Sequence, residues 1–216
     1  DAELRIQTIK TTIVEFLRDI FNNHGDIIGN ITSDKYLVLM SGSTISSFAD
    51  KDSFIKKKAE QIMDVIASNG YSAQVGIGYY ADTPEKFRGS FRSAWNALNI
   101  GKKIQNSNNI YNIKDFTLEN LLLSLNKENV ASFITPHLEK FRSSKDWNDE
   151  LETTLREWLD HPYQPSEVAH KLGIHRNSLY YRIDKINEIC NFDIKNSQDV
   201  FFLKFCILLE DLFKST

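Results

Sequence analysis

The chain has 216 residues, enough for one or two domains, and its 41% hydrophobic and 25% charged residues are typical of a globular protein. A formal net charge of −3 excludes an extensive basic surface for coating nucleic acid, but it permits a small local site. The sequence shows neither a signal peptide nor an apolar run long enough to cross a membrane, so we expect a cytoplasmic protein without membrane contacts.

Helices and strands alternate in the first half of the chain. Apolar residues at helical spacing predict helices over residues 3–22, 54–68 and 84–103. Runs of β-branched and aromatic residues predict strands over residues 26–31, 35–41, 74–80 and 110–113, of which the first two form a hairpin. The third helix is expected to turn an apolar face to the core, formed by Phe87, Phe91, Ala94, Trp95 and Leu98. This order predicts an α+β domain over residues 1–113, with helices covering a largely antiparallel sheet.

Two segments of this domain resemble the GGDEF domain of diguanylate cyclases. Val75-Gly76-Ile77-Gly78-Tyr79 resembles the V-S-I-G-I strand of that family. Ala94-Trp95-Asn96-Ala97-Leu98, followed by Gly101-Lys102-Lys103, resembles its A-D-x-A-L-x-x-A-K helix. The resemblance implies a GGDEF-like α/β sandwich in the first domain. Because Gly76 and Gly78 lie inside a strand, we interpret them as sites of close helix packing rather than of phosphate binding.

The sequence departs from that family at the catalytic signature. The signature would fall at Thr32-Ser33-Asp34-Lys35-Tyr36, where both glycines are missing and Lys35 replaces the central acid. Cyclase chemistry needs carboxylates that hold Mg²⁺ against a triphosphate, and a lysine cannot ligate the metal. We therefore expect a degenerate GGDEF-like domain that is no enzyme and serves as a scaffold. The alternative is a domain that binds a nucleotide, or an atypical nucleotidyl cyclase.

The second half of the chain is expected to be entirely helical. Residues 114–148 are interpreted as a helical connector, and residues 149–216 as an all-α domain. Cys190 and Cys206 fall in apolar helical patterns and are expected as buried free thiols. His170 and His175 are five residues apart, which does not place two ligands on one helical face, so neither a metal site nor a cofactor is expected.

Residues 165–190 predict two short helices joined by a tight turn. Pro165 suits the first position of a helix, and Gly173 supplies the left-handed conformation that commonly ends one. This combination is typical of a helix-turn-helix. One face of the second helix is apolar, formed by Leu179, Ile183, Ile186 and Cys190. We expect that face to pack inward, which leaves a polar face outside.

The outward face carries residue types that contact DNA. Asn177 and Tyr181 are predicted base readers, since asparagine can pair with adenine through two hydrogen bonds. Arg176 and Arg182 lie on the flanks and are predicted phosphate contacts, with Arg176 also able to read a base. The complete predicted DNA-binding set is His175, Arg176, Asn177, Ser178, Tyr180, Tyr181, Arg182 and Lys185. The alternative is a plain helical hairpin with a polar surface.

Charge limits how this helix can meet DNA. Asp184 and Glu188 would repel phosphate, so we expect only the first two turns to insert. From residue 165 to residue 195 there are five Lys or Arg residues and four Asp or Glu residues, so one copy should bind weakly and depend on dimerisation. A last helix over residues 199–213 is apolar nearly all round, and either a second copy or the connector helices cover its outer side.

The start of the second helix resembles a known family signature. His175-Arg176-Asn177-Ser178-Leu179-Tyr180-Tyr181-Arg182-Ile183 is similar to the H-R-N-T-L-x-Y-R-L motif of PucR/CdaR regulators, which control purine catabolism and sugar diacid utilisation. The resemblance extends from about Leu151 to Leu209. It implies a bacterial transcription regulator that binds a double-stranded DNA operator as a homodimer or larger assembly. Because the sequence starts at Asp1 and goes directly into a helix, we expect a fragment that lacks an N-terminal sensory domain.

Overall fold

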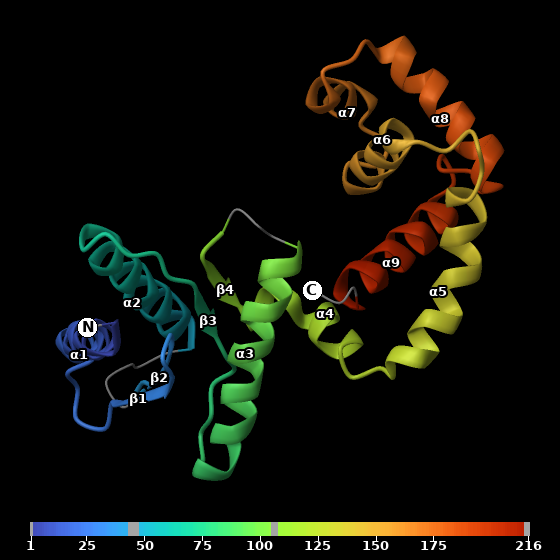
Figure 1. Ribbon diagram of the computed structural model, residues 1–216. Coiled ribbons are helices and arrows are strands. Elements are labelled where there is room, and N and C mark those ends of the chain that lie inside the picture. The colour runs from blue at the N-terminus through green and yellow to red at the C-terminus, as the bar shows by residue number, and fades with distance from the viewer. Residues whose placement is uncertain (1, 43–47, 105–107, 214–216) are drawn as a thin grey trace. The chain divides into compact units, whose positions relative to one another are not determined.

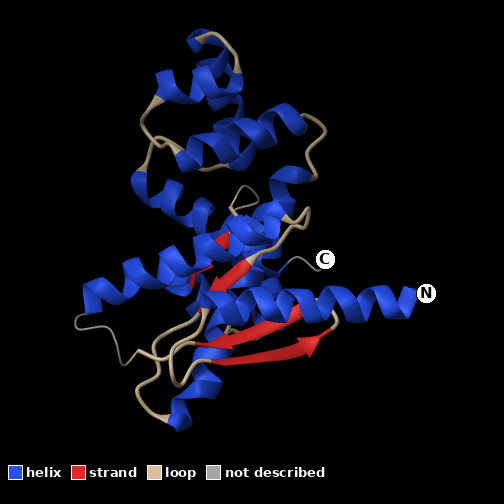
Figure 2. Cartoon of the chain, turned by 90° about the vertical axis from the view of Figure 1, so that its left-hand side faces the viewer, coloured by secondary structure: helices blue, strands red, loops and turns tan. Residues whose placement is uncertain are grey.

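The computed structural model describes residues 2–42, 48–104 and 108–213 (Figure 1). The chain divides into two compact units, Asp1–Thr117 and Leu118–Thr216. Helices dominate both units, and the described strands all lie in the N-terminal one (Figure 2). An α+β composition is thereby confirmed, whereas the expected domain limits at residues 113 and 148 stay a prediction. None of the described helices is long and apolar enough to span a membrane.

The N-terminal unit combines three long helices with two small sheets. The helices are α1 (Ala2–Ile20), α2 (Phe48–Ser68) and α3 (Phe87–Ile104), with 3-10 turns at Pro84–Lys86 and Ile113–Phe116. The strands are β1 (Ile27–Thr32), β2 (Lys35–Leu39), β3 (Val75–Ile77) and β4 (Ile110–Asn112). β1 and β2 form the expected antiparallel hairpin, in which Asn30 pairs with Tyr36. The single, largely antiparallel sheet that we expected is not formed by the described residues.

The second sheet is parallel because of its connection. β3 pairs with β4 in parallel, with Gly76 opposite Tyr111. α3 joins the two strands and packs against both of them (Figure 1). A parallel pair needs such a crossover, because a strand that turns back directly can only pair antiparallel. The order of elements was predicted, but the direction of this pairing was not.

The inward face of α3 differs in part from our expectation: Ala94 and Leu98 are half-buried and lie close to Gly76, but the buried residues are others. Its buried residues are Ser93, Ala97, Ile100 and Gly101. A Cβ atom on Gly76 would collide with the carbonyl oxygen of Ala94, and one on Gly78 with that of Ser90. These contacts confirm that the two glycines let α3 approach the strand closely.

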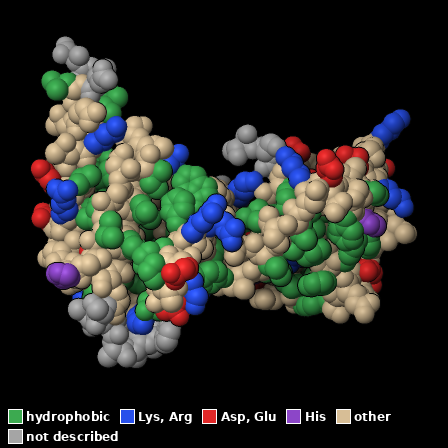
Figure 3. All heavy atoms as spheres, turned by 90° about the horizontal axis from the view of Figure 1, so that it is seen from below, with side chains coloured by type: hydrophobic (Ala, Val, Ile, Leu, Met, Phe, Trp, Pro, Cys, Tyr) green, Lys and Arg blue, Asp and Glu red, His purple; other side chains and the backbone are tan. Residues whose placement is uncertain are grey.

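The aromatic residues of α3 lie on a different side of the helix. Phe87 and Phe91 are each 38% exposed and Trp95 is 36% exposed, so the prediction that they face the core was wrong. The closest approach of α3 to the glycines is made by its backbone at Ser90 and Ala94, and the aromatic side chains point away from it. Figure 3 shows hydrophobic side chains lying open at the surface.

The C-terminal unit is a helical domain with an extensive core. Its helices are α4 (Thr117–Leu122), α5 (Lys127–Arg142), α6 (Asp149–Asp160), α7 (Pro165–Leu172), α8 (Arg176–Cys190) and α9 (Ser197–Phe213). α6 packs against α7, α8 and α9, and α5 packs against α8 and α9 (Figure 1). One continuous cluster of buried residues runs from Leu138 to Ile207. α5, which lies in the expected connector, therefore covers one side of α9.

Candidate nucleic-acid interface

α7, the following turn and α8 have the geometry of a helix-turn-helix. Pro165 is the first residue of α7, as predicted. Gly173 ends α7 in the left-handed region, with φ of 66°, and its N–H donates to the carbonyl of His170 at 3.1 Å. The N–H of Ile174 donates to the carbonyl of Ala169 at 3.0 Å, which completes a glycine-terminated helix end. A residue with a Cβ would be strained at Gly173 because of its φ, although the space around it is open.

The two faces of α8 differ as the sequence predicted. Leu179, Ile183 and Ile186 are 0% exposed and fill the core beneath the helix. On the other face Asn177 and Ser178 are exposed, and the Tyr181 side chain is 70% exposed. Burial of an apolar stripe fixes the rotation of a helix about its axis, so the first two turns of α8 present polar and aromatic groups outward.

His175 caps the start of α8. Its Nδ1 accepts a hydrogen bond from the backbone N–H of Asn177 at 3.2 Å. An accepting Nδ1 requires a neutral ring with its proton on Nε2, so Nε2–H remains a donor for another group. We predicted only the DNA contact, because histidine is not among the residues that usually cap helices. The cap could have been predicted from position, because His175 directly precedes Arg176, the first residue of α8.

Arg176 is held in place by a neighbour one turn further along. Its Nη2 donates to the hydroxyl of Tyr180 at 3.0 Å, and its guanidinium lies over the Tyr180 ring, 5.5 Å from the centroid. Both contacts are local to α8 and exposed. The Arg176 side chain is thus held in one conformation at the outer start of the helix. This lowers the side-chain entropy that is lost when Arg176 binds a ligand.

Two of the later charged residues of α8, Arg182 and Asp184, pair with residues of other elements. Arg182 contacts Glu150 and Thr154 of α6, and its side chain is only 21% exposed. Asp184, expected to repel phosphate, lies 3.1 Å from Nζ of Lys195, which partly compensates its charge. Lys185 is half-buried. The sequence did not indicate these pairs, because their members are 11 to 32 residues apart.

A cluster of charged side chains fastens α7 to α6. Lys171 lies 3.1 Å from Oε1 of Glu157 and also contacts Nε2 of His161. His161 Nδ1 is 3.3 Å from a carboxylate oxygen of Glu167. These contacts join the end of α6 to both ends of α7, and sequence reasoning had not singled them out.

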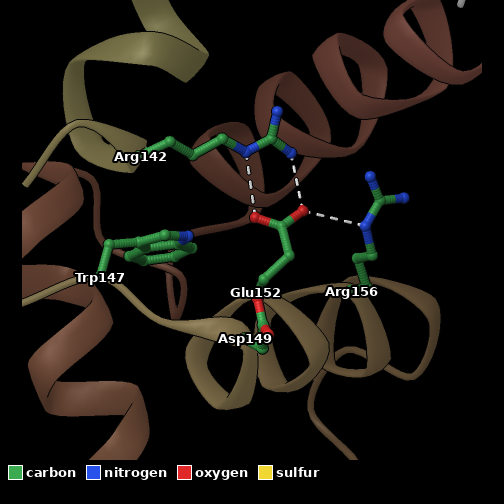
Figure 4. Close-up of a pocket in the computed structure, with 5 residues that line it drawn as sticks. All are labelled: Arg142, Trp147, Asp149, Glu152 and Arg156. Carbon is green, nitrogen blue, oxygen red and sulfur yellow. Dashed lines mark hydrogen bonds and ion pairs between the residues drawn. The ribbon is translucent and has the colours of Figure 1, made fainter.

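A shallow hollow of about 450 Å³ lies beside Arg142, Trp147, Asp149, Glu152 and Arg156 (Figure 4). Glu152 accepts from Arg142 at 2.7 and 3.0 Å and from Arg156 at 3.0 Å. Arg142 also pairs with Glu210 at 2.6 Å, and Arg156 with Asp211 at 2.8 Å. Acidic side chains already compensate both guanidiniums, so the hollow is not an anion site. The ion pairs beside it connect α5, α6 and α9.

This network shifts the pKa of Glu152. Burial by itself would raise the pKa of the carboxyl, but the hydrogen bonds and charges of Arg142 and Arg156 outweigh burial and place the pKa below its ordinary value. Glu152 therefore stabilises the domain in its ionised form.

The remaining candidate groups among the described residues are the two thiols, metal-ligating side chains and the β1–β2 turn. Cys190 and Cys206 are buried free thiols, as predicted, and burial raises their pKa values to about 12 and about 11. Across residues 2–42, 48–104 and 108–213 no group of three His, Cys, Asp or Glu side chains could hold a metal ion. At the β1–β2 turn, Asp34 accepts from the Thr32 hydroxyl at 2.7 Å, and Nζ of Lys35 lies 5.3 Å from the Trp95 ring centroid.

Comparison with known proteins decides the family of the C-terminal part. Residues 151–209 match the family described as the PucR C-terminal helix-turn-helix domain. Residues 151–209 are therefore similar to a PucR-type helix-turn-helix domain. The family predicted from the segment 175–183 is confirmed for these residues.

Two curated regulators are similar to the chain. The carbohydrate diacid regulator of Escherichia coli is 29% identical over 157 residues, which cover 72% of this chain and 40% of that protein. The purine catabolism regulatory protein of Bacillus subtilis is 27% identical over 103 residues, covering 48% of this chain and 19% of that protein. The chain thus matches less than half the length of either relative.

One solved structure was also similar. The regulator of polyketide synthase expression from Bifidobacterium adolescentis aligns over 92% of this chain and 74% of that chain, with 12% identity and a TM-score of 0.38.

Proposed function

We propose that the chain is a sequence-specific DNA-binding transcriptional regulator of the PucR/CdaR type. The observation that carries this proposal is the division of α8 between a fully buried apolar face and an exposed start with Asn, Ser, Tyr and Arg side chains. In a helix-turn-helix the first turns of the second helix contact base edges in the major groove. The similarity to two named transcription regulators supports the same function.

The start of α8 supplies both kinds of DNA contact. Asn177 reads adenine and Tyr181 packs against neighbouring base edges, because both side chains are exposed on the first two turns. Arg176 reaches a phosphate or a guanine from the outer start of the helix. His175 can donate from Nε2 while Nδ1 keeps the cap, and Ser178 can donate from its hydroxyl.

Two copies are needed for useful affinity. The helix-turn-helix is nearly neutral, and the Asp184–Lys195 pair compensates the charge of one of its few cations. A homodimer can place two α8 helices in half-sites about 34–36 Å apart. On α9, Phe201 is 70% exposed and stacks on Phe205 with 6.2 Å between ring centroids, which offers an apolar contact for the second copy.

The names of the relatives support a proposal for the regulated genes. Because the similar regulators are named for carbohydrate diacids and purine catabolism, we assign this chain to genes of sugar diacid or purine breakdown. Such a regulator acts in the bacterial cytoplasm, where its operator lies.

The N-terminal unit serves as a scaffold without catalysis. Its glycine strand and small-residue helix face support a degenerate GGDEF-like domain. In the turn where a cyclase needs metal-binding acids, Asp34 accepts a hydrogen bond from Thr32 and Lys35 lies over Trp95. Incubation with GTP and Mg²⁺ should give no cyclic dinucleotide, and formation of one would favour the alternative of an active cyclase.

Selection from random double-stranded DNA tests the proposed function. The full 216-residue chain is used at two salt concentrations, because phosphate contacts weaken with salt while base contacts set the motif. We expect one motif to be enriched at both concentrations, with half-sites related by two-fold symmetry. Enrichment of no motif would leave only a helical hairpin with a polar surface.

A further inference from the structure

Arg182 lies in the middle of α8 and reaches α6. Its Nη1 donates to Oγ1 of Thr154 at 3.3 Å, and its Nη2 lies 3.0 Å from Oε2 of Glu150. The Arg182 side chain is 21% exposed, whereas that of Glu150 is 71% exposed. The guanidinium therefore bridges from a solvent-facing carboxylate to the interior of the domain.

Thr154 is the buried end of this bridge. Its side chain is 0% exposed, and its hydroxyl donates to the carbonyl oxygen of Glu150 at 2.6 Å. That bond leaves the lone pairs of Oγ1 to accept from Arg182, so a buried hydroxyl is satisfied on both sides. Because Glu150 and Thr154 are one helical turn apart, a single planar guanidinium can contact both.

Arg182 adds directional contacts to the apolar packing that sets the overall rotation of α8. Leu179 and Ile183 hold α8 on the core through contacts that have no preferred direction. Hydrogen bonds and an ion pair from Arg182 do have one, so they resist small rotations of α8 about its own axis. Ser178 lies one turn before Arg182, and Asn177 beside it, so a rotation would displace the side chains that meet the bases.

We propose that Arg182 is a positioning residue that fixes α8 on α6 through Thr154 and Glu150 and sets how the first two turns enter the groove. This inference rests on the proposed function and deepens it, because it changes the role of one residue at the same site. The charge of the Arg182 guanidinium is compensated by Glu150, so Arg182 attracts a phosphate less strongly than Arg176, which contacts Tyr180. Specificity, rather than general affinity for DNA, should then depend on Arg182.

The experiment compares five forms of the full chain. They are the wild-type protein, Arg182→Gln, Glu150→Ala, the double variant, and Arg176→Gln as the matched control for a phosphate contact. Each is bound to the duplex that the wild-type protein enriches and to a scrambled duplex of the same length, over a range of salt concentrations. The two readouts are the ratio of the two affinities and the slope of log affinity against log salt.

The inference predicts a loss of specificity for both partners. Arg182→Gln lowers the affinity ratio about tenfold, which is comparable to losing one base contact. Glu150→Ala lowers the ratio by less, because Thr154 still accepts from Arg182. The double variant loses no more than Arg182→Gln alone, because Glu150 acts through Arg182. The salt slope of Arg182→Gln stays that of the wild type, whereas Arg176→Gln reduces it by about one.

Two results would overturn the inference while the proposed function stands. In the first, Arg182→Gln reduces the salt slope as Arg176→Gln does, which makes Arg182 a phosphate contact. In the second, the wild type binds its motif and Glu150→Ala keeps the full affinity ratio. Glu150 is exposed, so Glu150→Ala is expected to fold and can test the inference even if Arg182→Gln does not fold. A wild-type protein that enriches no motif removes the proposed function as well.

Discussion

The two units of this chain bury their apolar residues to different degrees. In the C-terminal unit Leu155, Leu179 and Ile183 are each 0% exposed. In the N-terminal unit Ile27 of the hairpin is 59% exposed, and Phe91 of α3 is 38% exposed. A helical domain in which every long helix packs on several others closes its own core, whereas the small sheets of the N-terminal unit leave apolar side chains open. Stability and rigid placement of a reading helix are therefore expected from the C-terminal unit.

The largest expected effect comes from truncating matched apolar residues in the two units. Leu155→Ala should lower the free energy of unfolding by about 3 kcal/mol, because it opens a cavity in a closed core. Phe91→Ala should cost about 1 kcal/mol or less, since its ring is partly in water already. Urea unfolding of both variants measures the difference. Equal losses would mean that the contrast between the units does not hold.

The close approach of α3 to β3 should make one glycine of the N-terminal unit costly to replace. Gly78→Ala should destabilise the protein by about 2 kcal/mol, because the new Cβ collides with the backbone of α3 at Ser90. Gly29→Ala is the control, since nothing lies within 4 Å of a Cβ at that strand position. The control should change stability by less than about 0.5 kcal/mol. Thermal unfolding of the two variants is sufficient, and a tolerated Gly78→Ala would argue against tight packing here.

The cap at the start of α8 predicts a smaller effect that separates stability from DNA binding. His175→Ala should cost about 1 kcal/mol of stability, because the N–H of Asn177 loses its acceptor. His175→Ser should restore the stability, since serine also caps helices, but not the DNA contact of Nε2. Unfolding and DNA binding are measured on both variants. Full DNA affinity in His175→Ser would show that His175 acts only as a cap.

The ion-pair network of the C-terminal unit predicts a modest dependence of stability on pH. The pKa of Glu152 is lowered in the folded state, so its contribution is present above the ordinary glutamate pKa and is lost as the pH falls through the lowered value. Glu152→Gln should therefore be less stable than the wild type near pH 7, with the gap narrowing in acid. Unfolding followed from pH 7 down to about pH 3 provides the comparison. A stability difference between the two proteins that stays constant over this pH range would mean that ionisation of Glu152 is not its cause.

Sequence reasoning succeeded where the determining contacts are local. Pro165, Gly173 and the spacing of Leu179 and Ile183 lie within one short segment, and they sufficed to predict α7, the turn and the buried face of α8. The role of Gly76 and Gly78 was likewise predicted from their place in a strand.

The remaining features depend on which distant elements meet. The aromatic face of α3 was predicted inward by periodicity alone, but Ser93 and Ala97 of α3 are buried where the helix approaches Gly76 and Gly78, in and directly after β3. The parallel pairing of β3 and β4 requires knowing that α3 crosses over between them. Arg182 looked like a surface cation because Glu150 and Thr154 lie about 30 residues earlier in the chain. Periodicity indicates that a helix has an apolar face. The elements that pack on the helix in the fold determine what that face contacts.

Base reading by the start of α8 can be tested directly by one measurement. Selection from random DNA is run in parallel with the wild type and with Asn177→Ala, a variant that changes an exposed residue outside the core. We predict that the variant loses its preference for adenine at one position of each half-site, by about tenfold or more, and keeps the rest of the motif. Identical motifs for both proteins, at equal affinity, would contradict the account.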